Sequence, residues 1–214
     1  MPNISKWTKV AVAIQSALAA ADTISAITKA NPGVVTTGSA HGMSNGAYVL
    51  LEVAGMAQVN DRVFRIANVA ASTFELEGED TTSYDTFVSG TAKEITFGTS
   101  MATAVTVTAS GGEFEYDDTT TIHVNQRSQI PTIASAALMT FDNIWDVADP
   151  ALIALKAASD ASTKRAILLT FANAQKLAFN AYVGATLLPG GTAPGKVTTQ
   201  VSLSMCARHT VYAT

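Results

Sequence analysis

The sequence has little cysteine and little charge. Cys206 is the only cysteine in 214 residues, which excludes disulfides within the chain and a zinc site made of several cysteines. A single cysteine beside Met205, at the end of an alternating run, is typical of a core residue in a reducing compartment. Charged residues make up 14%, against about 25% in an ordinary globular domain. Two explanations stay open: burial against copies of the same chain, or a secreted or wall-associated β protein.

A basic cluster is also missing. The net charge is −4, and the densest positive run is only Lys164-Arg165. Tight binding of nucleic acid through neutralisation of its phosphates is therefore disfavoured.

Long hydrophobic runs are absent too. No segment approaches the roughly 18 consecutive apolar residues that a membrane-spanning helix needs. Residues 10–21 follow two lysines and resemble a secretory signal, but Gln15 and Ser16 interrupt the run. We therefore interpret this segment as part of the fold.

Catalytic and metal-binding patterns are missing as well. The histidines His41, His123 and His209 are far apart in the sequence and lack metal-ligand spacing. His41 stands in a turn near Ser44 without the Gly-x-Ser-x-Gly pattern of a nucleophile elbow, and His123 is expected in a strand. We therefore expect no catalytic residue, no cofactor and no metal, and we expect the protein not to be an enzyme.

Acidic residues gather in two short segments, 77–85 and 113–118. Neither has the alternating aspartates of a calcium-binding EF-hand loop, and we interpret both residues 77–85 and the pair Asp117-Asp118 as solvated acidic loops. In the second segment the aromatic residues Phe114 and Tyr116 alternate with acidic ones.

The sequence is rich in short β-branched and aromatic runs that alternate with turn signals. Between residues 24 and 91 the turns Asn31-Pro32-Gly33, Asn45-Gly46 and Asn60-Asp61 recur at near-regular intervals, which predicts a small all-β module. Strands are expected at 34–37, 48–53, 62–69 and 73–77.

The rest of the chain also predicts mainly strands. Asp149 is a good N-cap and Pro150 suits the first helical position, so a single helix is expected at 150–159. After the first strand, a helix that starts within the alanine-rich residues 17–21 stays open as an alternative. Further strands are expected at 10–15, 23–29, 91–97, 105–109, 122–124, 137–145, 165–171, 176–183 and 197–205, with a loop at 129–132 around Pro131.

The last long strand has one apolar and one polar face. Val197, Thr199, Val201, Leu203 and Met205 alternate with the polar residues of the other face, which is typical of a sheet with one buried side. The polar residues are Thr198, Gln200, Ser202 and Ser204.

The order of these segments resembles the major tail tube protein family of long-tailed, non-contractile bacteriophages. The resemblance covers nearly the whole chain. Its most specific part is FDNIWDVADPALIALKAASDA (residues 141–161) followed by three long strands. The portion from NPGVVTTGSAHGMSNG to FELEG (residues 31–78) is less specific, because similar modules occur in several phage tail components.

This resemblance implies a mainly β fold, a β-sandwich or half-barrel flanked by one helix at about 150–159. It implies a discontinuous tail tube domain of residues 1–25 and 92–214, with residues 26–91 as an inserted small β module that faces outward. Six copies would close into a ring, and stacked rings would form the conduit for DNA. Candidate lumen-lining residues are Ala178, Asn180, Thr198, Gln200, Ser202 and Ser204.

The resemblance also implies partners and a location. The chain would contact further copies of itself, the tape measure protein, the tail terminator and the distal tail protein. DNA would pass through without being bound specifically, and no membrane is expected among the partners. It would be made in the bacterial host cytoplasm and end in the virion tail. Two alternatives stay open: another ring of the tail, such as a terminator or baseplate component, and a secreted carbohydrate-binding β module.

Overall fold

The computed structural model describes residue 4 and residues 6–213, and in this part of the chain the fold is mainly β with one α-helix. The first strands are β1 (Ala11–Leu18), β2 (Asp22–Ile27), β3 (Val34–Thr37), β4 (Tyr48–Ala54), β5 (Arg62–Ala67), β6 (Thr73–Leu76) and β7 (Ser89–Met101), with a short 3₁₀ helix η1 (Ala57–Val59). The later elements are β8 (Ala104–Ser110), β9 (Phe114–Asp118), β10 (Gln129–Ala134), β11 (Leu138–Ile144), α1 (Pro150–Asp160), β12 (Lys164–Thr170), β13 (Lys176–Gly184), β14 (Thr198–Met205) and β15 (Thr210–Tyr212).

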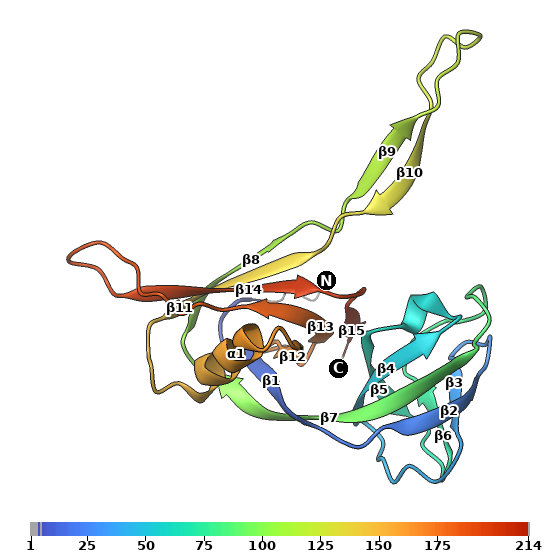
Figure 1. Ribbon diagram of the computed structural model, residues 1–214, viewed down its shortest axis with the longest axis horizontal. Helices are drawn as coiled ribbons and strands as arrows, with labels where there is room; N and C mark the ends of the chain where they lie inside the picture. Colours follow the sequence, from blue (N-terminus) through green and yellow to red (C-terminus); the bar gives the residue numbers. More distant parts are fainter. Residues whose placement is uncertain (1–3, 5, 214) are drawn as a thin grey trace.

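All strands except β9 and β10 belong to one hydrogen-bonded sheet (Figure 1). Its order is β2-β3-β6-β5-β4-β7-β1-β12-β13-β14-β11-β8, with β15 beside β13. Because β2 also pairs with β7, the strands β2, β3, β6, β5, β4 and β7 close on themselves. We call these six strands the barrel. The strands β1, β12, β13, β14, β11 and β8, with β15 beside β13, form the remainder, which we call the wall sheet.

The barrel and the wall sheet have separate cores. Phe64, Phe74 and Leu51 are fully buried inside the barrel, whereas Phe141 and Phe179 are fully buried between the wall sheet and α1. A third, smaller cluster includes Tyr48, Leu50, Leu168, Ala178 and Tyr212, and it joins the outside of the barrel to the wall sheet. The long strand β7 contributes to both parts, because it pairs with β4 along its first half and with β1 along its second.

The helix α1 covers the apolar face of the wall sheet. The Asp149 carboxylate accepts hydrogen bonds from the backbone N–H groups of Ala151 (2.7 Å) and Leu152 (3.2 Å), and Pro150 takes the first helical position. Leu152 and Leu155 are buried against the sheet. The start of the helix is therefore where the sequence predicts it, and its end at Asp160 lies one residue later.

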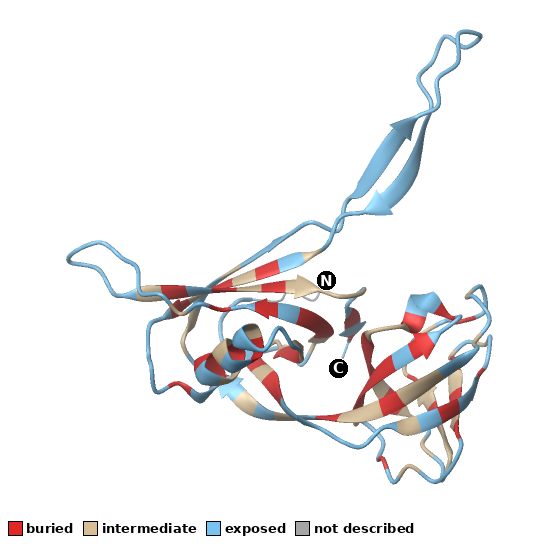
Figure 2. Ribbon diagram, viewed as in Figure 1, coloured by how far each residue is buried: buried red, intermediate tan, exposed pale blue. Residues whose placement is uncertain are grey.

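A two-stranded ribbon projects from the molecule. It consists of β9 and β10 and leaves the wall sheet between β8 and β11, with no other element beside it (Figure 1). Every described residue from Thr108 to Ala136 is exposed, as Figure 2 shows. We call residues 113–134 the arm.

Two local predictions were wrong, and one open alternative does not hold. Residues 129–132 are part of β10 and not a loop, because Pro131 lies in a ribbon whose outer edges have no partner and which therefore needs no N–H at that position. Residues 122–124, with His123, form the turn at the tip of the arm and not a strand. The helix start considered at 17–21 is absent, because β1 continues to Leu18.

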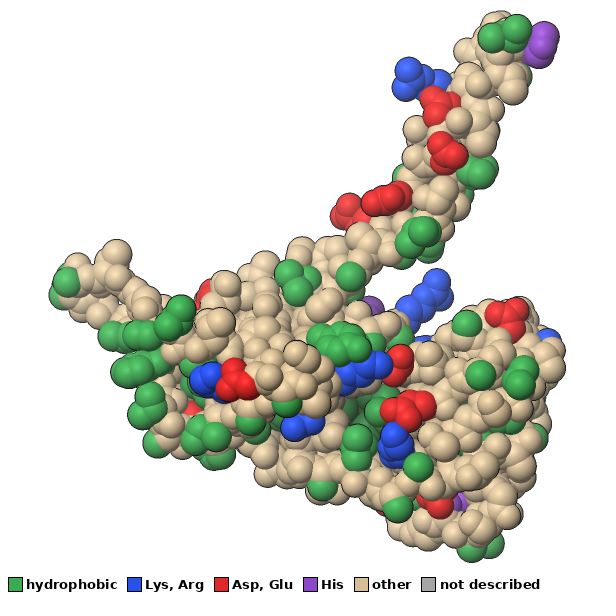
Figure 3. Space-filling view, in the orientation of Figure 1, with side chains coloured by type: hydrophobic (Ala, Val, Ile, Leu, Met, Phe, Trp, Pro, Cys, Tyr) green, Lys and Arg blue, Asp and Glu red, His purple; other side chains and the backbone are tan. Residues whose placement is uncertain are grey.

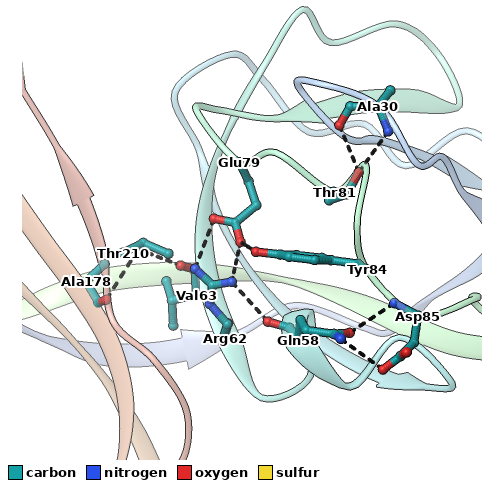
Figure 4. Close-up of polar contacts among 10 residues, drawn as sticks. All are labelled: Ala30, Gln58, Arg62, Val63, Glu79, Thr81, Tyr84, Asp85, Ala178 and Thr210. Carbon is teal, nitrogen blue, oxygen red and sulfur yellow. Dashed lines mark hydrogen bonds and ion pairs between the residues drawn. The ribbon is translucent and has the colours of Figure 1, made fainter. Parts of the chain in front are cut away.

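Asp117 and Asp118 are exposed, but they belong to β9 and not to a loop. The acidic segment 77–85 is also not a solvated loop throughout. Glu77 pairs with Arg65, and Glu79 pairs with Arg62, whose side chain is only 7% exposed. Tyr84 donates a further hydrogen bond to Glu79 at 2.6 Å (Figure 4). These contacts hold residues 77–85 against β5 of the barrel.

No helix within the described residues is long and apolar enough to span a membrane.

Candidate functional site

One face of the wall sheet is polar across three neighbouring strands. Antiparallel pairing aligns Ser202 of β14 with Thr140 of β11, and Thr140 with Thr108 of β8. The next row aligns Gln200 with Asp142. We call this surface the polar face. Its polar residues are Thr106, Thr108, Ser110, Thr140, Asp142, Thr198, Gln200, Ser202 and Ser204. Two apolar residues of β11, Leu138 and Ile144, lie on the same side and are 37% and 44% exposed.

The polar face arises from simple alternation. In a strand successive side chains point to opposite sides, so the residues between the polar ones point toward α1. Phe141, Val201 and Leu203 are fully buried on that side. A shift of register by one residue would exchange the two faces, and the buried apolar residues therefore fix the polar ones in place.

The polar face carries almost no charge. Asp142 is the only charged residue within β8, β11 and β14, and these strands contain no lysine, arginine or histidine. The Gln200 side-chain amide donates a hydrogen bond of 3.1 Å to the Asp142 carboxylate. The face is therefore hydrated, rich in hydroxyl groups and slightly negative.

The four predicted residues of β14 all lie on this face. Gln200 is exposed, and Thr198, Ser202 and Ser204 are half-buried. The hydroxyl of Ser202 donates to the carbonyl of Gly184 at 3.3 Å, which occupies part of its hydrogen-bonding capacity.

The two predicted residues of β13 lie elsewhere. Ala178 is fully buried and Asn180 is 2% exposed, because the barrel covers this part of the wall sheet. Ala178 packs in the third cluster, and its carbonyl accepts a hydrogen bond from Thr210 at 3.3 Å. In this conformation neither side chain presents a surface to a channel.

Sequence reasoning missed the contributions of β8 and β11. Thr106 and Thr108 alternate with Val105 and Val107, so the signal for a second polar row was present in the sequence. The sequence does not predict that β8, β11 and β14 pair with one another, and this pairing joins their polar residues into one surface.

The wall sheet ends in an open edge. β8 is the last strand of the sheet and pairs only with β11 among the described strands. Its other edge presents backbone N–H and C=O groups that have no strand partner. Such an edge favours pairing with a strand of another molecule.

Polar contacts from β15 and from the start of β12 attach the barrel to the wall sheet. The Thr210 hydroxyl donates to the Val63 carbonyl at 2.8 Å (Figure 4), and Lys164 pairs with Asp61 at 2.8 Å. Desolvation by burial raises the pKa of the neighbouring Cys206 thiol, which disfavours its reactive thiolate. This junction is therefore structural in character.

The described part of the chain contains no group of three or more His, Cys, Asp or Glu side chains that could hold a metal ion. The chemistry that remains is that of a surface. A broad, mainly polar sheet face with a single carboxylate, beside an open strand edge, suits contact with water and with further copies of the chain.

Comparison with known protein families places the chain in one of them. Residues 54–214 match the family described as phage tail tube protein, TTP. The matched region includes the whole polar face, α1 and the arm. No curated protein matches the chain.

Proposed function

The chain belongs to the phage tail tube protein family, and from this membership we propose that its copies close into rings whose stacking forms the tube for DNA. The coarser role follows from the family: it is a structural component of the phage tail. The ring, which we propose to be a hexamer, and the passage of DNA through it are our proposal.

The observation that carries this proposal is the polar face. A bore for DNA has to be hydrated and free of cation clusters, because every lysine or arginine contact with a phosphate releases counterions and strengthens binding. Strands β8, β11 and β14 supply a surface with a single carboxylate and no cation. We therefore propose that Thr198, Gln200, Ser202 and Ser204 line the channel together with Thr106, Thr108, Thr140 and Asp142.

The open edge of β8 supports closure into a ring. Pairing of this edge with the next copy would continue the sheet from subunit to subunit and would leave no strand edge exposed in the closed ring. Contacts between unlike surfaces of successive rings would permit stacking without a fixed end.

The barrel is the module that we propose to face outward. It packs over β12, β13 and β15 on the side of the wall sheet that faces away from α1, and it leaves the polar face of β8, β11 and β14, which lies on that same side, uncovered. We keep residues 26–91 as the inserted module and residues 1–25 and 92–214 as the tail tube domain. Contacts with the tape measure protein, the tail terminator and the distal tail protein are part of the same proposal, and no reaction is assigned to the chain.

The test places cations on the polar face. Gln200→Lys and Thr108→Lys change exposed residues, so the subunit should fold and assemble. Virions with both changes should release DNA more slowly, and added salt should restore the rate because it screens phosphate contacts. Ser83→Lys, on an exposed turn of the barrel, is the matched control and should have no effect. Unchanged release in the double variant would contradict a bore lined by this face.

The assembly state of the purified protein distinguishes a tube protein from another ring protein of the tail. A tube protein should polymerise into long tubes of stacked rings, whereas a terminator or baseplate ring should stop at one or two rings. Negative-stain micrographs of the purified protein distinguish the two.

A further inference from the structure

A hollow lies at the junction of the barrel and the wall sheet, and we call it the junction hollow. It has a volume of about 420 Å³, which is within the range of small-ligand sites, and such sites often lie between packed units. One side belongs to the barrel and includes η1 and the start of β5, whereas the other side is the connection from β14 to β15. The lining residues are Ala57, Gln58, Asn60, Asp61, Arg62, Tyr84, Cys206, Ala207 and Arg208.

The charges of the junction hollow are not fully balanced. Charged side chains of both signs gather where the barrel meets the wall sheet, as Figure 3 shows. Lys164 pairs with Asp61 at 2.8 Å, and Arg62 pairs with Glu79. Arg208 is exposed and forms no salt bridge with a described residue. The hollow therefore carries one unpaired positive charge.

The side-chain carbonyl and carboxylate oxygens of the junction hollow are already in use as acceptors. Gln58 Oε1 accepts from the backbone N–H of Asp85 at 3.3 Å, and Asn60 Oδ1 accepts from a backbone N–H of β4 at 2.9 Å. The Asp61 carboxylate accepts from Lys164. A ligand that mainly donates hydrogen bonds would therefore find few side-chain partners in this hollow.

Several donors, in contrast, are free. The backbone N–H groups of Ala207 and Arg208 and the Arg208 guanidinium donate to no residue in the described part of the chain. On the barrel side, the outer nitrogens of Arg62 donate to Glu79 and to the carbonyl of Gln58 (Figure 4). The Arg62 Nε is buried and has no hydrogen-bond partner among the described residues. A buried N–H group of a cation is energetically unfavourable unless an acceptor reaches it.

Free donors beside an unpaired cation select an anionic acceptor. Guanidinium groups match oxyanions in shape, and charge-assisted hydrogen bonds are about twice as strong as neutral ones. A tetrahedral phosphate has enough oxygens to accept from several donors at once, which a chloride ion does less well. The volume of the hollow also leaves space for the body of a phosphomonoester.

We propose that the junction hollow binds a phosphate-type oxyanion, with Arg208 and the backbone N–H groups of Ala207 and Arg208 as donors and with Arg62 Nε on the barrel side. The bound anion would connect the barrel to the wall sheet and stabilise their packing. The residues of this site lie outside the polar face, so the site is separate from the proposed bore. The inference does not depend on assembly into a tube.

The thiol of Cys206 can report on the site, because it lines the same hollow and is the only cysteine. The rate of its alkylation by iodoacetamide, a neutral reagent, is measured with increasing inorganic phosphate at an ionic strength held constant with chloride. Phosphate should slow the reaction several-fold and to a plateau. Arg208→Gln should need about tenfold more phosphate for the same effect, because it loses a charged donor. Arg127→Gln, which removes an exposed arginine from the arm, is the matched control and should behave as the wild type.

Thermal unfolding gives an independent measurement. A ligand that binds only the folded state stabilises it, so phosphate should raise the unfolding midpoint of the wild type and of Arg127→Gln more than that of Arg208→Gln. Glycerol phosphate is the probe for an ester: the anion that protects Cys206 at the lower concentration is the better ligand. Alkylation that neither anion slows, or that phosphate slows equally in Arg208→Gln, would overturn the inference and leave the proposed tube intact.

Discussion

The phenol of Tyr212 accepts a hydrogen bond from the backbone N–H of Arg65 at 2.7 Å, while the Arg65 guanidinium carbon lies 4.6 Å from the centre of the same ring. The two residues are 147 positions apart in the sequence. This contact ties the last strand of the wall sheet to β5 of the barrel. It makes the orientation of the barrel a property of the fold and not of a flexible linker.

Tyr212→Phe should test this tie. The substitution leaves the ring in place and removes the oxygen that accepts from Arg65, so a partly buried N–H loses its partner. The expected loss is about 1–2 kcal/mol in the free energy of unfolding, measured by chemical denaturation. Val211→Ala, at a neighbouring side chain that is 62% exposed, is the control and should change stability little. Equal effects of the two substitutions would mean that the tie contributes nothing.

Alkaline pH should weaken the same junction. Desolvation by burial raises the pKa of Tyr48 from 10.0 to about 12, since Tyr48 is packed between the barrel and the wall sheet. The folded state therefore favours the neutral phenol, and its stabilising contribution is complete below pH 10 and lost as the pH rises toward 12. Denaturation midpoints between pH 9 and about 12 measure this loss. Tyr48→Phe should reduce the loss but not abolish it, because burial also raises the pKa of Tyr212 in the same cluster. Tyr116→Phe, at a residue of the arm that is 63% exposed, is the control and should leave the profile as it is.

The buried ion pair of the barrel should matter more than an exposed one. Glu79→Ala leaves the Arg62 guanidinium, which is 7% exposed, without its carboxylate and should cost about 3 kcal/mol. The matched control is Glu52→Ala, which breaks a pair with Lys93 whose side chains are 45% and 26% exposed. That change should cost less than about 1 kcal/mol. A comparable cost for both would contradict the view that the segment 77–85 is fastened through Arg62.

The helix cap gives a fourth prediction. Asp149→Ala removes an acceptor for two backbone N–H groups and should cost about 1 kcal/mol. Asp149→Asn retains an oxygen acceptor at the cap and should cost less. Asp160→Ala, which breaks only an exposed pair with Lys156, should change stability by a few tenths of a kcal/mol. Thermal unfolding of the three variants measures the order.

The local parts of this fold were predictable, and the long-range parts were not. The strand at 34–37 and the start of α1 follow from side-chain alternation and from an Asp-Pro cap, which are signals of a few neighbouring residues. The closure of the barrel through β2 and β7 depends on pairing between segments about 70 residues apart, for which the sequence has no local signal.

The candidate site shows the same division. Alternation identified the polar residues of β14, but it also selected Ala178 and Asn180, because a small or polar residue looks alike whether it faces water or a second packed element. The arm escaped recognition as a ribbon for a related reason. In β9 the aromatic residues Phe114 and Tyr116 do alternate with acidic ones, but every residue of both strands is exposed, so no buried apolar face marks the ribbon, and Pro131 suggested a loop.

The most direct test of the central claim is a helical reconstruction of the assembled protein by electron cryomicroscopy. The account predicts tubes in which β8, β11 and β14 face the bore, with Thr108, Thr140 and Gln200 on its surface and the barrel on the outside. Tubes whose bore is lined by α1 or by the barrel would contradict it, and so would a chain that stays monomeric at high concentration.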